Sequence, residues 1–103
     1  MMPAPILEHM PALSDIEIQR GLGGLPGWSR KGDTLIKGYH FATFPAGIDF
    51  IRRVADIAEK MNHHPDIDIR YTKVNFVLST HDAGGITDKD LALAHAIEEL
   101  AAA

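Results

Sequence analysis

An amphipathic pattern between Ile48 and Met61 strongly predicts an α-helix. Its apolar residues recur at steps of three and four while charged residues fall on the opposite side, which is typical of a helix packed on one face. Pro65 then disfavours the helical conformation for His64 and offers no N–H of its own. We therefore expect the helix to end near Asn62, with two adjacent histidines held at a fixed corner. The apolar positions of this helix are Phe50, Ile51, Val54, Ile57, Ala58 and Met61, and the charged ones are Asp49, Arg52, Arg53, Asp56 and Lys60.

A third histidine follows a predicted strand. From residue 74 to residue 80 apolar and polar side chains alternate, which is typical of a strand with one buried face. His81 would leave this strand on its more polar side, and the turn signals of residues 82–85 follow at once. Histidines held at a helix exit and at a strand end suit acid–base chemistry better than histidines on a mobile loop. The positions expected to face the core are Val74, Phe76 and Leu78.

Glu59 is the carboxylate expected to act on the histidine pair. It lies one helical turn before His63, close enough in a helical register to orient or charge that imidazole. The plainer alternative is a carboxylate that simply faces solvent. For His63 and His64 the plainer alternative is a polar helix terminus, where histidine favours the negative end of the helix dipole.

The remaining patterns predict an α+β domain. Helix starts are signalled by the capping residues Ser14, Thr43 and Thr87, and residues 31–33 are typical of a hairpin turn. In the strand after this turn Lys37 shares a face with apolar residues, which suggests a strand buried mostly at one end. The order is therefore helix, two strands, helix, two strands, helix. Short links within each strand pair favour a four-stranded antiparallel sheet with three helices packed on one face.

Length and composition limit the chain to one globular domain. With 103 residues, 46% of them hydrophobic, we expect a single domain over residues 13–103, preceded by an extended lead-in over residues 1–12. The net charge of −4 gives no basic surface for nucleic acid, and the absence of cysteine excludes disulfides and thiolate chemistry. No apolar run approaches the roughly 18 residues of a membrane span, and no signal peptide is recognisable. We therefore expect a cytoplasmic protein.

A set of widely separated positions has the spacing of a known signature. Together they resemble the signature of the pterin-4a-carbinolamine dehydratases, over roughly residues 13–100. Two positions differ from the residues common in that family: Ile67, where an aromatic residue is frequent, and Asn62, where an acidic one is frequent. The signature positions are Glu59, His63, His64, Pro65, Tyr71, His81 and Asp90, with further matches at Leu13-Ser14, Gly27-Trp28 and residues 78–87.

The resemblance implies the dehydration of a 4a-hydroxytetrahydropterin to a quinonoid dihydropterin and water, in tetrahydropterin recycling. This reaction removes hydroxide from C4a and a proton from a ring nitrogen, so a general acid and a general base should both help. Imidazoles supply both forms near neutral pH, and neither a cofactor nor a metal is required. By resemblance His63, His64 and His81 are the catalytic residues. Our hypothesis gives the acid–base work to His63 and His81, with His64 binding or positioning the ring. The residues expected to bind substrate or support the site are Glu59, Pro65, Trp28, Ser79, Thr80 and Asp90.

Several of these positions also have structural explanations. Residues 87–90 form a capping box, so Asp90 could serve its helix alone. Trp28 could be a flat wall for the pterin ring or simply a core residue. Ser79 and Thr80 could be ordinary strand residues, and His81 a surface histidine beside a turn.

Two other functions compete with the dehydratase. The first is a metal site built from the three histidines with Glu59 or Asp90, although adjacent histidines diverge in direction and cysteine is absent. The second is a protein-binding module that acts as a dimerisation or transcriptional cofactor, as some members of the resembled family do. The resemblance also implies a homodimer or homotetramer, with a pterin-dependent aromatic amino-acid hydroxylase as a pathway neighbour. Direct contact with nucleic acid is not expected.

Overall fold

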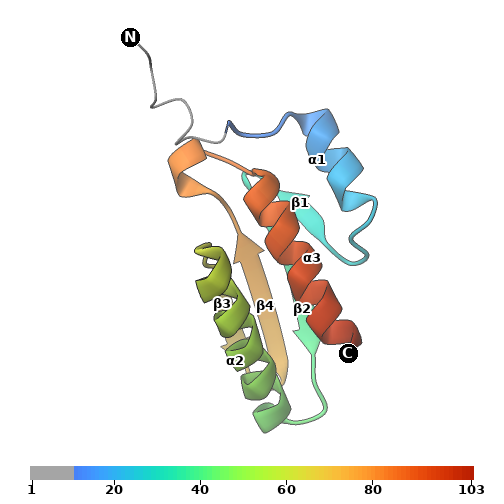
Figure 1. The fold of residues 1–103 in the computed structure, drawn as a ribbon. Helices are drawn as coiled ribbons and strands as arrows, with labels where there is room; N and C mark the ends of the chain where they lie inside the picture. The colour runs from blue at the N-terminus through green and yellow to red at the C-terminus, as the bar shows by residue number, and fades with distance from the viewer. Residues whose placement is uncertain (1–10) are drawn as a thin grey trace.

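The computed structural model describes residues 11–103, so the predicted lead-in falls outside the described residues except for its last two positions. The predicted order of helices and strands is confirmed (Figure 1). A 3-10 helix, which the sequence suggested only as a turn, follows the last strand. The elements are α1 (Asp15–Leu22), β1 (Ser29–Lys31), β2 (Thr34–His40), α2 (Phe44–Met61), β3 (Asp66–Arg70), β4 (Lys73–Leu78), the 3-10 helix η2 (His81–Ala83) and α3 (Asp88–Ala102).

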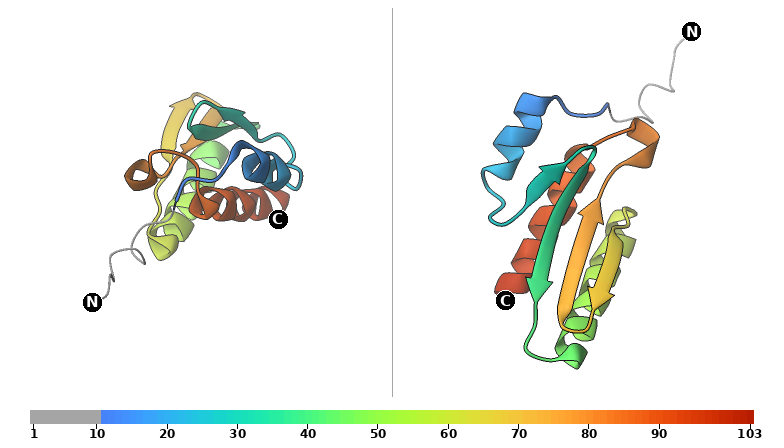
Figure 2. Two further views of the ribbon diagram at one scale, coloured as in Figure 1. Left: turned by 90° about the horizontal axis from the view of Figure 1, so that it is seen from above. Right: turned by 180° about the vertical axis from the view of Figure 1, so that it is seen from behind.

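The four strands form one antiparallel sheet in the order β1-β2-β4-β3. The helices lie together on one face of this sheet, as predicted, and the view from above separates the two layers (Figure 2). Because β4 lies inside the sheet beneath α2 and α3, its C-terminal end meets both the exit of α2 and the start of α3. Among the helices of residues 11–103, none combines the length and apolar character that crossing a bilayer requires.

Helix ends occur where the capping signals predict them. Ser14 and Thr87 each start a helix with a complete capping box, and Thr43 accepts a hydrogen bond from the backbone N–H of Ala46. Asn62 ends α2 in the left-handed conformation, with φ of 50°. Asparagine tolerates this conformation better than most residues, so it suits the corner at which the chain leaves the helix.

The core lies between the sheet and the helices. The alternation along β4 is confirmed, since Val74, Phe76 and Leu78 are all fully buried. They pack with Val54 of α2 and with the apolar face of α3, which includes Leu93 and Ile97. Burying a large aliphatic or aromatic side chain contributes about 1.5 to 3 kcal/mol, so this cluster holds both helices on the sheet.

Lys37 explains the irregular pattern of β2. It faces the helix side, where its ammonium lies 2.5 Å from the carboxylate of Glu98 on α3 and 2.8 Å from the carbonyl of Pro26. The indole N–H of Trp28 donates to the same carboxylate at 3.3 Å, and so does the hydroxyl of Tyr39. Burial raises the pKa of Glu98, but the hydrogen bonds from Lys37, Tyr39 and Trp28 outweigh this effect and leave the pKa below its ordinary value. The prediction of a strand buried mostly at one end is confirmed, since Leu35 near its start is fully buried whereas Gly38 and His40 near its end are exposed.

This network should make stability depend on pH. Because folding lowers the pKa of Glu98, its contribution is present above the unfolded-state value and is lost as pH falls through the folded-state value. We expect Glu98→Gln to lower the free energy of unfolding by about 1 to 2 kcal/mol at pH 7. The difference from wild type should shrink as the pH falls below the ordinary pKa of glutamate.

Urea unfolding followed by circular dichroism between pH 3 and pH 7 measures this difference. Glu99→Gln is the matched control, since Glu99 is the exposed neighbour on the same helix. A Glu98→Gln difference that stays constant across the whole pH range would contradict the assignment.

Candidate active site

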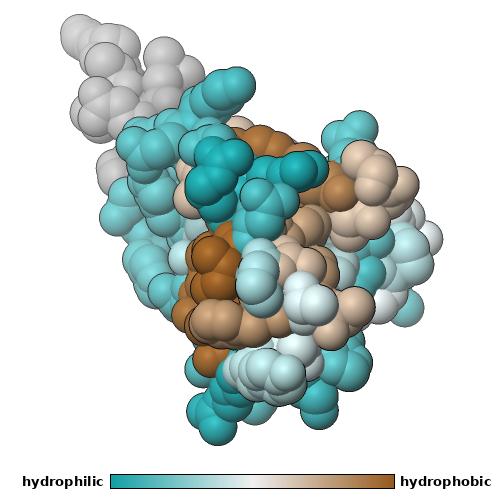
Figure 3. Space-filling model, turned by 90° about the horizontal axis from the view of Figure 1, so that it is seen from below, coloured by the Kyte–Doolittle hydropathy of each residue, from teal (hydrophilic) through white to brown (hydrophobic). Residues whose placement is uncertain are grey.

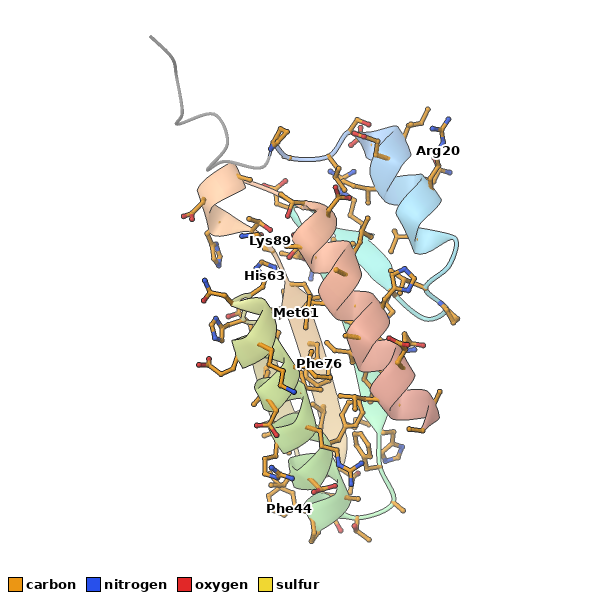
Figure 4. The ribbon with its side chains drawn as sticks, viewed as in Figure 1. Arg20, Phe44, Met61, His63, Phe76 and Lys89 are labelled. Carbon is orange, nitrogen blue, oxygen red and sulfur yellow. The ribbon has the colours of Figure 1, made fainter. Side chains whose placement is uncertain are left out.

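The three predicted histidines lie on one cleft of about 310 Å³. The exit of α2, the end of β4 and the first turn of α3 form its walls, which is the junction that the sheet order creates. Figure 4 shows His63 and Lys89 at this junction, between the end of α2 and the start of α3. The lining residues are Asn62, His63, His64, Ser79, Thr80, His81, Asp82 and Lys89.

A carboxylate buried beneath the cleft holds His63. The Nε2 atom of His63 lies 2.6 Å from Oδ1 of Asp90, and both side chains are almost or completely inaccessible to solvent. The other carboxylate oxygen of Asp90 accepts the hydroxyl of Thr80 at 2.8 Å and the backbone N–H of Thr87 at 2.9 Å. Asp90 therefore caps α3, as its plainer explanation required, and also contacts a histidine of the cleft.

The hydrogen bonds around Asp90 have a definite direction. The hydroxyl of Thr80 has one hydrogen and donates it to Asp90, so in the 2.7 Å contact between the two threonines Thr87 is the donor. The Thr87 oxygen accepts in turn from the backbone N–H of Lys89 at 3.2 Å. A carboxylate only accepts hydrogen bonds, so each neighbour in contact with Asp90 is a donor. The Nε2 atom of His63 therefore carries a hydrogen. The Nδ1 atom is the remaining proton-exchange position of this imidazole.

Glu59 contacts the other histidine of the pair. Its carboxylate lies 2.5 Å from Nε2 of His64, and both side chains are more than half exposed. The prediction that Glu59 orients His63 was therefore wrong, because Glu59 contacts His64 instead. It assumed that helical spacing continues through the pair, but the left-handed turn at Asn62 swings His63 inward and leaves His64 beside the carboxylate.

His81 is the histidine of the cleft that has no carboxylate partner. It begins η2 and is exposed, and no hydrogen bond of its imidazole is found within residues 11–103. Its backbone is nevertheless fixed. Thr80 and Gly85 form a bridge across the loop, and Gly84 closes the turn with φ of 71°, a conformation that favours glycine.

Four predicted residues are not part of the lining of the cleft: Glu59 and Asp90, which contact its histidines, and Trp28 and Pro65. Trp28 is buried under the C-terminal half of α3, where it donates to Glu98. Glu98 comes eight positions after Asp90, about 12 Å further along the helix, so the indole of Trp28 is not a wall of this cleft. Pro65 directly follows His64, where it restricts the backbone at the helix exit and does not line the cleft. The core explanation is therefore the better one for Trp28.

Asn62, Asp82 and Lys89 also line the cleft, although they were not among the predicted site residues. Asn62 and Asp82 flank the predicted histidines, so their position was available from the sequence. Lys89 offered a weaker signal, because it is a basic residue in the first turn of α3, where acidic residues are preferred.

A second recess, of about 360 Å³, lies towards the opposite end of the molecule. Aromatic side chains of β2 and α2 line it, together with the last residues of α3, and none of the predicted site residues does. Figure 3 shows apolar side chains gathered on this side of the molecule. Phe44 and Ile48, in the first turns of α2, are half-exposed. Volume alone would favour this recess, but the chemically active side chains are in the histidine cleft.

Within residues 11–103, no group of three or more histidine or carboxylate side chains has an arrangement that could hold an ion. The two carboxylates near the histidines are each committed to one imidazole, Asp90 to His63 and Glu59 to His64.

Solved structures resemble this fold closely. The crystal structure of a transcriptional coactivator/pterin dehydratase from Brucella melitensis matches with a TM-score of 0.85 and 28% identity, covering 87% of this chain and 98% of that one. A pterin dehydratase-like protein, identified as a RuBisCO assembly factor in the alpha-carboxysome, matches with a TM-score of 0.59 and 25% identity, covering 72% of this chain and 86% of that one.

Sequence relatives are closer still. A protein of Mycobacteroides abscessus, provisionally named a pterin-4-alpha-carbinolamine dehydratase, is 57% identical over 89 residues, which cover 86% of this chain and 95% of the relative. A protein of Mycobacterium tuberculosis with the same provisional name is 50% identical over 91 residues, covering 88% and 97%. The sequence profile described as pterin 4 alpha carbinolamine dehydratase matches residues 11–100. The chain therefore belongs to the pterin 4 alpha carbinolamine dehydratase family.

Proposed function

We propose that this protein dehydrates a 4a-hydroxytetrahydropterin to a quinonoid dihydropterin and water by histidine acid–base catalysis, in tetrahydropterin recycling. The observation that carries the proposal is the convergence of His63, His64 and His81 on one cleft, with His63 held by a buried carboxylate. A histidine that served only to end a helix would not need a hydrogen bond to a buried carboxylate that Thr80 and Thr87 also hold in place.

The reaction needs two proton transfers and no change of oxidation state. The C4a–O bond breaks and its electron pair leaves with the oxygen, which takes a proton and departs as water. A ring nitrogen loses a proton, and its electron pair forms the new C=N bond. We assign these transfers to His63 and His81, with His64 positioning the ring. Each well-placed proton transfer contributes roughly 10² to 10⁴ in rate, or about 3 to 5 kcal/mol of barrier.

Asp90 acts through His63 rather than on the substrate. Its carboxylate takes the Nε2 hydrogen of His63, so Nδ1 is the atom assigned to exchange a proton with the substrate. Thr80 and Thr87 fix the carboxylate in turn. A carboxylate that fixes the tautomer and orientation of a reacting imidazole is a recurring catalytic device.

The assembly and the cellular setting are part of the same proposal. The sheet ends in the exposed strands β1 and β3, and such edges are commonly paired or covered. We therefore propose a homodimer or homotetramer that works in the cytoplasm without metal or other cofactor. A pterin-dependent aromatic amino-acid hydroxylase would supply the substrate.

The first test measures decay of 4a-hydroxytetrahydropterin with chelator-treated protein. Wild type should accelerate the decay, and His63→Ala and His81→Ala should each lower kcat/KM by about 10² or more, because each removes one proton transfer. His95→Ala is the control, since His95 is an exposed histidine of α3 outside the cleft. Failure of the folded wild type to accelerate the decay would refute the proposal, and loss of activity on chelation would refute its metal-free form.

The second test separates the two roles of Asp90. Asp90→Asn keeps an oxygen that can accept the backbone N–H of Thr87, so the cap survives in part. The amide forces a different hydrogen-bond arrangement on His63. We expect kcat to fall by about 10² or more, with a loss of about 1 to 3 kcal/mol in the free energy of unfolding.

Steady-state rates, urea unfolding and nitrogen-15 NMR of the imidazole report on these two effects. Asp88→Asn provides the control in the same helical turn, since Asp88 is exposed. Wild-type activity in a folded Asp90→Asn protein would restrict Asp90 to helix capping.

A protein-binding role is the second candidate. It is favoured by the two structural relatives, one described as a transcriptional coactivator and the other as an assembly factor. Such a role has no physical need for imidazoles. Partner binding that survives in a His63→Ala, His81→Ala double variant, with a wild type that lacks dehydratase activity, would favour this alternative.

A further inference from the structure

Lys89 brings a positive charge to the histidine cleft. It is the second residue of α3, and its side chain lines the cleft together with His63 and His81. Figure 4 shows it beside His63 on the facing element. Among the lining residues it is the one lysine or arginine. Its backbone N–H is bound to Thr87, so the capping box that positions Asp90 also fixes the base of this side chain.

Helix stability does not explain a lysine at this position. The N-terminal turn of a helix carries a partial positive charge, so a basic residue there is unfavourable by about 0.3 to 1 kcal/mol. An ion pair could offset that cost, but Lys89 forms none with any carboxylate of residues 11–103. The exposed ammonium is therefore available to a ligand.

The charges around the cleft give this ammonium a task. Asp82 lines the cleft, Asp90 is buried beneath it and Glu59 contacts His64, so three carboxylates lie at or near the cleft. Departure of hydroxide puts negative charge on an oxygen at the same place. Nearby carboxylates oppose that charge, whereas the ammonium of Lys89 can stabilise it.

We propose that Lys89 is a catalytic residue whose ammonium donates a hydrogen bond to the oxygen that leaves C4a. This inference rests on the proposed dehydratase function. The ammonium keeps its protons throughout: the oxygen takes the electron pair of the broken C4a–O bond and receives its proton from a histidine. Lysine suits this task because its ammonium offers three donors and no acceptor.

The test compares Lys89→Met, Lys89→Gln and Lys89→Arg. The Met and Gln variants should lower kcat by about 10- to 100-fold with a KM change below about threefold, because the contact strengthens only as the bond breaks. Lys89→Arg keeps a cationic donor and should retain more activity than either. Lys60→Met is the control, since Lys60 is exposed on α2 and does not line the cleft.

A purely structural role is distinguished by the pH–rate profile. Loss of a positive charge beside His63 and His81 favours their protonated forms, so both limbs of the kcat/KM profile should move to higher pH in Lys89→Met. Simple destabilisation of the fold would leave the limbs in place.

The outcomes separate this inference from the proposal beneath it. If Lys89→Met and Lys89→Gln keep kcat within about threefold of wild type, or raise KM alone, the role of Lys89 is overturned. An inactive His63→Ala variant would still support the dehydratase in that case. A folded wild type without activity would overturn both.

Discussion

Both the fold and the site depend on the hydrogen bonds to the buried carboxylate of Asp90. An ionised carboxylate without solvent access is costly unless donors surround it. Here the donors come from three places: His63 after α2, Thr80 after β4 and Thr87 before α3. Satisfying the charge therefore requires all three segments to meet at one point. The cleft is the outer surface of that meeting point.

Most of the fold followed from the sequence because its signals are local. Capping residues such as Ser14 and Thr87 act within a single turn, and the alternation along β4 needs only the difference between core and solvent. Lys37 was harder to interpret. Its partner Glu98 is distant in sequence, so the sequence could not show how a lysine on an inward face is neutralised. Sequence periodicity cannot reveal a neutralising partner on another element.

The histidines of the site were predictable, but the contacts between residues were not. Their convergence needed only the helix exit and the strand end, both of which the sequence marks. The partner of Glu59 depended on one left-handed residue, Asn62, which changes the direction of the chain between two neighbouring histidines. The places of Trp28 and Lys89 relative to the cleft depended on how α3 lies across the sheet, a tertiary feature for which the sequence carries only the weak signal of a basic residue in the first turn of α3.

The one-way chain of hydroxyl hydrogens from Thr87 through Thr80 to Asp90 has an evolutionary consequence. Each member serves the start of α3 and the orientation of His63 at once, so selection on folding and selection on chemistry act on the same atoms. Such a site has little freedom to drift one residue at a time. Replacement of any member by an isostere without a hydroxyl or carboxylate would leave the other members without a hydrogen-bond partner. Change here should therefore occur by concerted substitution or not at all.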